Sequence, residues 1–469
     1  MSPPAAIGSP HRVVVVGGGF GGIRAVQRLR HPGLDVTLID RRNFHLFQPL
    51  TYQIATGALP AGQVAYPLRA LFKSAGNVRV LLAQASAVDL AARRVALGNA
   101  PGTEAPASVP YDTLIVAAGS SYSYFGHEQW REYAAEVKTL ESAIAVRSRI
   151  LRAFEQAEMT DDEAVRERQM TFVIVGGGPT GVEMAGQIAE LARDTLRRDF
   201  RAIDPRSTKV LLVEAGDRLL ATFPRSLSAK ATRSLTRLGV SPMLNQAVVD
   251  VDAHGVTVSA PDGSAQKIPA ATVIWAAGVN ASGLAAHLGQ LAGAEVDPAG
   301  RVTVESDLTL RGHPEVIVLG DMVRVRDRDG NVRTLPGVAP VAIQQGHYAA
   351  RLIRDRLKER STPPFRYLDK GNLATIGRGR AVADLHIVRL SGLPAWLVWL
   401  FVHLWYLIGF ENRLLVMIQW SFSFFTHGRG ARLIDEPFPS AGGPVQSTNS
   451  PATRSSSATR PGIEARSRS

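Results

Sequence analysis

The sequence predicts an α/β fold in which one Rossmann-like plan occurs twice, followed by a helical C-terminal region. Two observations predict the repeat. A run of β-branched residues leads into a Gly-x-Gly-x-x-Gly motif near the N-terminus, and a similar run and motif begin at Thr171. Each motif is followed by a helical pattern and by a strand that ends in an acidic residue. A third observation, a nearly uncharged stretch over 393–425, predicts the C-terminal helices.

The first motif follows the apolar strand Val13–Val16 and consists of Gly17, Gly19 and Gly22. Gly17 permits the tight turn, Gly19 lets the backbone approach a pyrophosphate, and Gly22 lets the helix pack closely on the strand. The helix would present free N–H groups and the positive end of its dipole to the phosphates. The next strand ends at Asp40, about 20 residues beyond the glycines, where an acid that binds an adenosine ribose belongs. The stretch therefore predicts a dinucleotide site.

The second motif consists of Gly176, Gly178 and Gly181, and its acid is Glu214. Glu214 lies 38 residues after Gly176, whereas Asp40 lies 23 after Gly17, and the pattern over 182–204 predicts one extended crossover helix in between. A carboxylate at this place favours a free 2′-hydroxyl and repels a 2′-phosphate. We therefore expect NADH to be preferred over NADPH.

The repeat continues beyond the two motifs, because the strand at 272–278 echoes the strand at 113–119. Two dinucleotides side by side indicate a flavin and a nicotinamide that exchange a hydride. A further apolar strand ends in Gly320-Asp321, and Pro340 is well placed to begin a helix that runs to about Leu357. That helix would aim its positive end at the flavin and stabilise the negative charge of the reduced state.

Composition narrows the function further. The chain has 469 residues, enough for two or three domains, and no cysteine, which excludes disulfides, thiol redox chemistry and iron–sulfur clusters. The net charge is +12, but the basic residues are scattered and no nucleic-acid module occurs, so an anionic membrane surface is the better partner. Residues 1–10 lack an apolar core of signal-peptide length, so the body is expected to stay in the cytoplasm.

The order of these motifs resembles that of flavoprotein reductases with two dinucleotide-binding domains. Within that group, the loop Phe47–Leu50, the segment Gly178–Glu183 and the pair Gln344-Gln345 resemble type II NADH dehydrogenases. These are single-subunit NADH:quinone oxidoreductases that do not pump protons. The resemblance covers about residues 11–435.

The resemblance implies non-covalent FAD at the first motif, NADH at the second, and no metal. It places Asp321 at the ribityl chain of FAD, Glu183 near the nicotinamide, Lys370 near the flavin and Gln344 at the quinone ring. Pro340 stands where the family pattern has another glutamine, which bears on the quinone contacts. The alternative for Gln344 and Lys370 is a plain surface role. The expected cofactor-binding residues are Gly17, Gly19, Gly22, Asp40, Arg41, Gln48, Ala118, Gly119, Gly176, Gly178, Gly181, Glu214, Ala277, Gly278, Gly320 and Asp321.

The apolar C-terminal stretch contains an uncharged segment over 393–410 and a second segment over 414–425. Four of the six tryptophans fall between 396 and 420, which suits a membrane interface. An early proline and His403 favour a helical pair lying in one leaflet over a spanning helix. A buried core helix or a dimer face remains an alternative. Basic residues flank the stretch and could bind anionic lipid: Arg389, Arg413, Arg429 and Arg432.

The leading hypothesis is a respiratory NADH:quinone oxidoreductase, a homodimer bound peripherally to the cytoplasmic face of the cell membrane. A thiol-disulfide or sulfide:quinone reductase is excluded by the lack of cysteine. A reductase of a soluble electron carrier and a non-enzymatic NADH-sensing flavoprotein remain alternatives. The expected organisation is a disordered N-terminus (1–10), an FAD-binding domain in two parts (11–167 and 283–364), an NADH-binding domain (168–282), a membrane-associating region (365–435) and a disordered Ser/Pro/Gly/Arg-rich tail (436–469).

Overall fold

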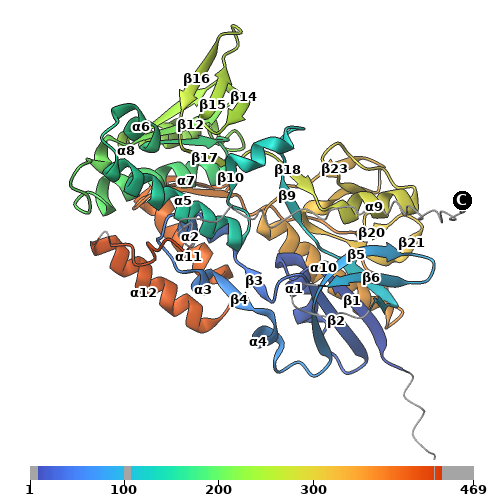
Figure 1. The fold of residues 1–469 in the computed structure, drawn as a ribbon. Helices are drawn as coiled ribbons and strands as arrows, with labels where there is room; N and C mark the ends of the chain where they lie inside the picture. The colour runs from blue at the N-terminus through green and yellow to red at the C-terminus, as the bar shows by residue number, and fades with distance from the viewer. Residues whose placement is uncertain (1–8, 100–106, 427, 436–469) are drawn as a thin grey trace, which may run out of the picture. The chain divides into compact units, whose positions relative to one another are not determined.

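The computed structural model describes residues 9–99, 107–426 and 428–435. Most of the segment expected to form a disordered N-terminus, and the whole of the expected disordered tail, lie outside these residues. The first Rossmann-like half is an eight-stranded sheet in the order β20-β21-β8-β1-β2-β5-β6-β7 (Figure 1). Its inner strands β21, β8, β1, β2 and β5 are parallel. The strands are β1 His11–Val16, β2 Leu34–Asp40, β5 Val78–Asp89, β6 Arg94–Asn99, β7 Ser108–Pro110, β8 Thr113–Val116, β20 Thr309–Leu310 and β21 His313–Val318.

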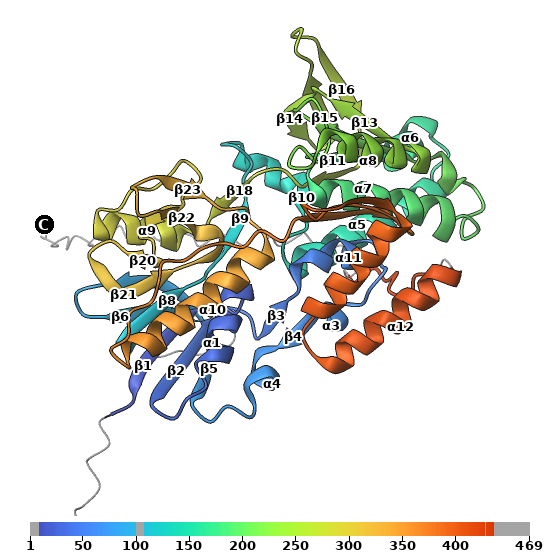
Figure 2. The same cartoon turned by 180° about the vertical axis from the view of Figure 1, so that it is seen from behind.

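Two helices, α1 (Phe20–Arg28) and α10 (Ala339–Arg356), lie side by side against this sheet (Figure 2). Their close approach requires small residues, because a Cβ added at Gly346 of α10 would lie 2.2 Å from the carbonyl oxygen of Gly21. Val13–Val16 are buried in the core beneath α1, as expected for a parallel strand covered on both faces.

The second half is a five-stranded sheet in the order β10-β17-β11-β12-β13, and all its strands are parallel. The order β8-β1-β2-β5 in the first half corresponds to β17-β11-β12-β13 in the second, so the internal repeat and the predicted fold class are confirmed. The elements are β10 Ala134–Glu136, α5 Leu140–Met159, α6 Glu163–Gln169, β11 Thr171–Val175, α7 Pro179–Glu190, β12 Lys209–Glu214, α8 Arg225–Leu238, β13 Val240–Leu244 and β17 Thr272–Trp275, with an antiparallel sheet of β14 Ala247–Asp252, β15 Gly255–Ser259 and β16 Ala265–Pro269.

The extended crossover helix expected over 182–204 is wrong. Helix α7 ends at Glu190, a short π-helical turn follows over Leu191–Thr195, and the chain then runs irregularly to β12. The carboxylate of Glu158 on α5 accepts the backbone N–H groups of Arg201, Ala202 and Ile203. These bonds satisfy backbone N–H groups of the irregular segment, so a tertiary contact holds residues 201–203 outside any helix.

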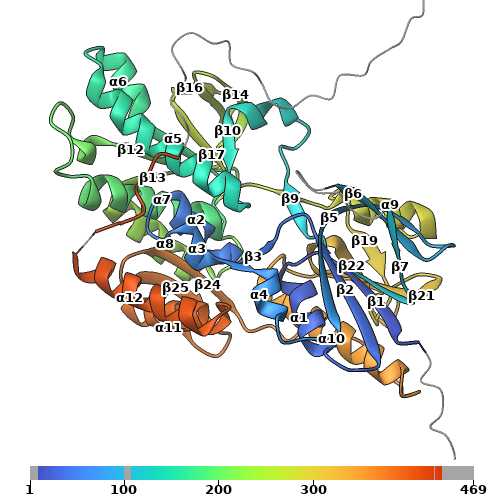
Figure 3. The same ribbon diagram turned by 60° about the horizontal axis from the view of Figure 1, so that its bottom comes forward.

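The C-terminal region begins with an antiparallel sheet of β24 (Asn372–Gly377), β25 (Arg380–Asp384) and β26 (Arg389–Gly392), which packs on α7. Two adjacent helices follow, α11 (Leu393–Tyr406) and α12 (Phe410–Thr426) (Figure 3). Among the described residues, no helix is long and apolar enough to cross a membrane. The predicted helical pair is present, with its break at 407–409.

Shorter elements join these layers. They are β3 Phe44–Leu46, the 3-10 turn Gln48–Leu50, α2 Thr51–Ala55, α3 Ala61–Val64, β4 Ala65–Pro67, α4 Leu68–Phe72, β9 Ser120–Tyr122, the 3-10 turn Glu128–Glu132, β18 Val279–Ala281, α9 Gly283–Ala292, β19 Val302–Val304, the 3-10 turn Gly320–Met322, β22 Val323–Arg326 and β23 Val332–Thr334.

Candidate active site

The first glycine turn, between β1 and α1, can be formed only with glycine at two of its positions. Gly17 has a φ of +104°, and a Cβ added there would lie 2.3 Å from the carbonyl oxygen of Ala117. A Cβ at Gly22 would lie 1.9 Å from the carbonyl oxygen of Gly17. At Gly19, in contrast, a Cβ would meet no atom within 4 Å. The backbone therefore borders open space at Gly19, a cradle that fits the pyrophosphate of a dinucleotide.

The second glycine turn, between β11 and α7, has the same geometry. Gly176 has a φ of +108°, and a Cβ there would lie 3.0 Å from the carbonyl oxygen of Ala276. A Cβ at Gly181 would lie 1.8 Å from the carbonyl oxygen of Gly176, whereas one at Gly178 would meet nothing within 4 Å. The two turns therefore offer equivalent backbone surfaces that would fit a pyrophosphate.

The two acids sit identically beside these turns. Asp40 accepts the N–H of Gly18 at 2.6 Å on one oxygen and the N–H of Arg42 at 2.7 Å on the other. Glu214 accepts the N–H of Gly177 at 2.5 Å and that of Gly216 at 2.7 Å. Burial raises the pKa of Asp40, and the two N–H bonds oppose that shift. Each carboxylate oxygen keeps a lone pair that can accept a ribose hydroxyl.

A cleft of about 1500 Å³ runs along the carboxyl ends of the first sheet to the second half and to α11. Its position follows the rule that open α/β sheets bind ligands where the strand order reverses. Twelve expected site residues line it: Gly17, Gly19, Asp40, Arg41, Gln48, Ala118, Gly119, Glu183, Gly278, Gly320, Asp321 and Lys370. The remaining ones do not: Gly22, Gly176, Gly178, Gly181, Glu214, Ala277 and Gln344.

Glu183, on α7, is the buried acid of the cleft. Burial raises its pKa to about 8, although a hydrogen bond at 3.4 Å from the Thr375 N–H acts in the opposite direction. The side chain is therefore neutral at pH 7 and can donate a hydrogen bond from its carboxyl group. The fully buried Tyr52 of α2 lies near enough for the charge of Glu183 to contribute to raising its pKa, after burial itself.

Lys138 and Ser120 form a polar group with Asp321 that the sequence analysis missed. The ammonium of Lys138 donates to the Ser120 hydroxyl at 2.6 Å, and that hydroxyl donates to Asp321 at 2.5 Å. Lys138 Nζ lies 3.9 Å from the Asp321 carboxylate, and burial lowers the pKa of Lys138. Ser120 directly follows the expected Gly119, which is a weak signal, but nothing in the sequence pairs Lys138 with an acid far along the chain.

Gln344 lies outside the lining of the cleft, whereas Lys370 belongs to it. The amide of Gln344 donates to the Leu368 carbonyl and accepts the Leu368 N–H, both at 2.9 Å, so it holds the segment that carries Lys370. Lys370 itself lines the cleft and donates to the Tyr406 hydroxyl at 3.2 Å. Gln345, next to Gln344, is fully buried and accepts the Gly320 N–H at 2.6 Å.

Large apolar side chains surround the mouth of the cleft. Phe401 and Trp405 of α11 line the cleft while being 63% and 65% exposed. They belong to a stripe that recurs every four residues along α11, and α12 carries a similar stripe. The exposed residues of the two stripes are Leu393, Leu397, Phe401 and Trp405 on α11, and Phe410, Leu414, Ile418 and Phe422 on α12.

The position of Arg429 contradicts the expectation that this residue binds anionic lipid. Its side chain is buried, donates to the Thr56 carbonyl at 3.0 Å and lies 3.7 Å from the buried carboxylate of Glu190. It therefore fastens the segment after α12 to the protein interior and is not available to lipid. Arg413 donates to the carbonyls of Trp405 and Leu407, so it caps the end of α11.

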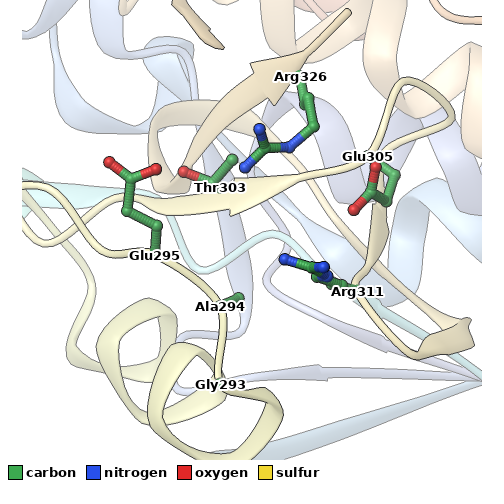
Figure 4. Close-up of a pocket in the computed structure, with 7 residues that line it drawn as sticks. All are labelled: Gly293, Ala294, Glu295, Thr303, Glu305, Arg311 and Arg326. Carbon is green, nitrogen blue, oxygen red and sulfur yellow. The ribbon is translucent and has the colours of Figure 1, made fainter. Parts of the chain in front are cut away.

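A second, smaller hollow of about 360 Å³ lies in the first half, beside β19 and the end of α9 (Figure 4). Its charged lining residues have opposite signs: Glu295, Glu305, Arg311 and Arg326. None of the expected site residues lines it. The large cleft, lined by the first glycine turn and by Pro179 and Thr180 directly after Gly178, is therefore the better candidate for the active site.

Comparisons with known proteins agree with this geometry. The family model "Pyridine nucleotide-disulphide oxidoreductase" matches residues 11–346, and the model "NDH2 C-terminal domain" matches residues 370–429. The type II NADH:quinone oxidoreductase NdhA of Mycobacterium tuberculosis is 44% identical over 92% of this chain and 91% of its own length. The enzyme named Ndh from the same organism is 43% identical over 93% of each chain.

The structure of NDH2 from Plasmodium falciparum in complex with NADH superposes on this chain with a TM-score of 0.82 at 20% sequence identity. The match covers 91% of this chain and 100% of that one, and it shows a shared fold. The extent of the two Mycobacterium tuberculosis matches, together with the C-terminal domain, shows that the chain belongs to the type II NADH:quinone oxidoreductase family.

Proposed function

We propose that this protein is an FAD-dependent NADH dehydrogenase that reduces a membrane quinone and does not pump protons. The observation that carries the proposal is the single cleft that is lined by the first glycine turn, by Glu183 next to the second, and by the exposed aromatic residues of α11. When FAD is bound, its chemistry is to take up a hydride from NADH and to release electrons to quinone. The protein supplies binding, orientation and electrostatics.

The cofactor roles follow the repeat. The first turn and Asp40 would hold FAD, with Asp321 fixed for the ribityl chain by Ser120 and Lys138. The second turn and Glu214 would hold NADH, and the neutral Glu183 would face the nicotinamide as a hydrogen-bond donor. Helix α10 begins at the cleft with Pro340 in its first turn, so the positive end of its dipole favours negative charge there.

The stripes on α11 and α12 support a peripheral membrane attachment. Burying one large apolar side chain contributes about 1.5–3 kcal/mol, so several inserted residues give firm attachment without a spanning helix. Because Phe401 and Trp405 belong both to a stripe and to the cleft, a quinone could enter from lipid without crossing water. Attachment to the cytoplasmic face, a homodimer, and the domain bounds 11–167, 168–282, 283–364 and 365–435 complete the proposal.

The central test is an assay of purified protein with NADH and a short-chain quinone, followed at the NADH absorbance. We expect a yellow protein that releases FAD on denaturation and oxidises NADH in a quinone-dependent manner. Reduction of soluble electron carriers with no quinone reduction would overturn the proposal in favour of a carrier reductase. Binding of NADH without turnover of either acceptor would favour a sensor.

Membrane attachment is tested by replacing stripe residues that lie outside the cleft. Leu397→Glu combined with Ile418→Glu should release the protein from membranes and slow reduction of a long-tail quinone in vesicles, while short-chain quinone reduction persists. The matched control is Leu291→Glu on α9, a leucine of similar exposure outside the C-terminal region. If the stripe variant stays membrane-bound, α11 and α12 form a protein interface instead.

A further inference from the structure

His45 lies beneath the first glycine turn and has no part in the roles described above. It belongs to β3, is 2% exposed and packs edge-on against Phe20, with 5.0 Å between ring centroids. Its Nδ1 lies 3.0 Å from the carbonyl oxygen of Gly18. His45 does not line the cleft, so any effect on a ligand has to act through the turn.

The chemistry of this contact fixes the tautomer of the ring. A carbonyl oxygen can only accept, so Nδ1 carries the proton and donates it to Gly18. Burial lowers the pKa of His45 to about 4, so the ring is neutral at pH 7 and has a single N–H. Nε2 is buried and has no hydrogen-bond partner among the described residues. The one donor of this histidine is therefore committed to the glycine turn.

The Gly18 carbonyl belongs to the same peptide plane as the N–H of Gly19. In a trans peptide these two groups point in opposite directions, and no cis peptide occurs in the described backbone. Holding the carbonyl towards His45 therefore turns the Gly19 N–H the other way. Gly19 lines the cleft, and an added Cβ there would meet open space, so we expect this N–H to face the pyrophosphate.

The second turn meets the same requirement by another means. There the carbonyl of Gly177 accepts the backbone N–H of Leu220 at 2.8 Å. The surroundings are otherwise alike: an added Cβ would lie 2.9 Å from Leu68 at Gly18 and 2.7 Å from Leu219 at Gly177. A donor to the middle carbonyl is thus present in both halves, which argues that the turn needs one. Only the first half uses a side chain for it.

We propose that His45 is a positioning residue for FAD, whose Nδ1–H holds the Gly18 carbonyl so that the Gly19 N–H faces the pyrophosphate. The inference rests on the proposed FAD site. His45 acts through the backbone of the turn. The rate of FAD release should therefore depend on the hydrogen-bond donor of the side chain more than on the aromatic ring.

The test compares three variants of the purified FAD-loaded protein: His45→Phe, His45→Asn and His45→Gln. The amide nitrogen of asparagine can take the place of Nδ1, whereas that of glutamine reaches towards the place of Nε2. The rate of FAD release after dilution is followed by the rise in flavin fluorescence. We expect release to be about tenfold faster in His45→Phe, as for a buried acceptor that loses its donor. His45→Asn should stay near the wild-type rate, and His45→Gln should resemble His45→Phe.

The second turn and a second histidine provide the controls. Binding of ADP-ribose to the loaded protein, measured by calorimetry, should be unchanged in all three variants. His11→Phe, which removes a half-buried histidine of β1 that contacts Thr113, should leave FAD release unchanged. Release at the wild-type rate in His45→Phe, or equal rates in the asparagine and glutamine variants, would overturn the inference.

If His45→Phe does not fold, the FAD release rates of His45→Asn and His45→Gln still test the proposal. A loss of ADP-ribose binding that parallels the loss of FAD would show a general structural role and would likewise overturn it. Failure of the proposed function looks different, because then the wild-type protein itself would hold no FAD.

Discussion

The two glycine turns share one backbone geometry, but the middle carbonyl is held by a side chain in the first turn and by the backbone in the second. The first turn depends on His45 for its middle carbonyl, and its Gly21 packs against Leu319 and against Ala342 of α10. In the second turn the Leu220 N–H takes the place of His45, and each of these donors follows the acid of its own half, Asp40 or Glu214. The geometry of the first turn therefore depends on the identity of one side chain, whereas the second turn takes the equivalent hydrogen bond from the backbone.

The helix after each turn shows a second difference. Two residues beyond the last glycine, the first half has Arg24 and the second has Glu183. Burial lowers the pKa of Arg24 and raises that of Glu183, so each shift favours the neutral form. Glu183 lines the cleft and Arg24 does not. The two halves therefore share a backbone arrangement, but only the second half places the side chain at this helix position in the cleft.

The largest expected effect is the loss of stability caused by substitution of Gly22. Substitution of Gly19 should instead affect FAD binding. Gly22→Val should destabilise the fold by more than about 3 kcal/mol, because its Cβ would overlap the Gly17 carbonyl and backbone cannot yield as a side chain does. Gly19→Val should fold with a nearly normal melting temperature and hold no FAD. Gly178→Val should remain yellow and lose only NADH binding. Thermal melting, FAD content and calorimetry with ADP-ribose measure these outcomes.

Two outcomes of these glycine variants would contradict the proposed cofactor sites. FAD retained by Gly19→Val would remove the first cradle from the FAD site. Loss of FAD from Gly178→Val would show that the two halves do not bind their nucleotides independently.

The acid of the second half should control the choice of nicotinamide. Glu214→Gln removes the charge that repels a 2′-phosphate while keeping the side-chain length. We expect the preference for NADH over NADPH to narrow by about 10- to 100-fold, through weaker NADH binding and stronger NADPH binding. Steady-state KM values for both nucleotides measure it, and Asp40→Asn should leave the preference unchanged. Equal use of both nucleotides by the wild-type protein would contradict this role.

The raised pKa of Glu183 predicts a pH-dependent contribution to stability from the second half. The folded protein keeps Glu183 protonated up to about pH 8, while the unfolded chain ionises it near its ordinary pKa of 4.5. The folded state therefore binds the extra proton, so this contribution to stability is complete below 4.5 and declines as the pH rises to 8.

Glu183→Gln stays neutral, and its comparison with the wild type isolates this effect. Relative to the wild type, the variant should gain melting temperature steadily from pH 5 to pH 8 and level off above. Arg24→Gln provides the first-half control and should show no such trend over that range. A constant difference between wild type and Glu183→Gln would mean that Glu183 is ionised in the folded protein.

Sequence reasoning reached the parts of the site that are encoded locally. The two turns, Asp40 and Glu214 follow from spacing along one strand–helix–strand unit, so the pattern alone located them. The sequence did not predict three contacts between separate segments: Lys138 with Asp321, Gln344 with Leu368, and Arg429 with Glu190. The irregular segment around Arg201 was missed for the same reason, because its backbone bonds to Glu158 of another helix. Neither periodicity nor residue type carries information about such pairings.

The smallest effect concerns Arg41, the exposed residue that follows Asp40 in the first half; Ala215 occupies the corresponding place after Glu214. An exposed charge contributes about 0–1 kcal/mol, so Arg41→Ala should speed FAD release only a few-fold at low salt. Because the Debye length is about 10 Å at 0.1 M salt and about 3 Å at 1 M, the difference should vanish at high salt. The control is Arg42→Ala, since Arg42 is paired with Glu141 at 2.9 Å and should change release less. A large, salt-independent effect of Arg41→Ala would instead mean that its guanidinium makes a direct, desolvated contact with the cofactor, and that the first half depends on a side-chain anchor with no counterpart in the second.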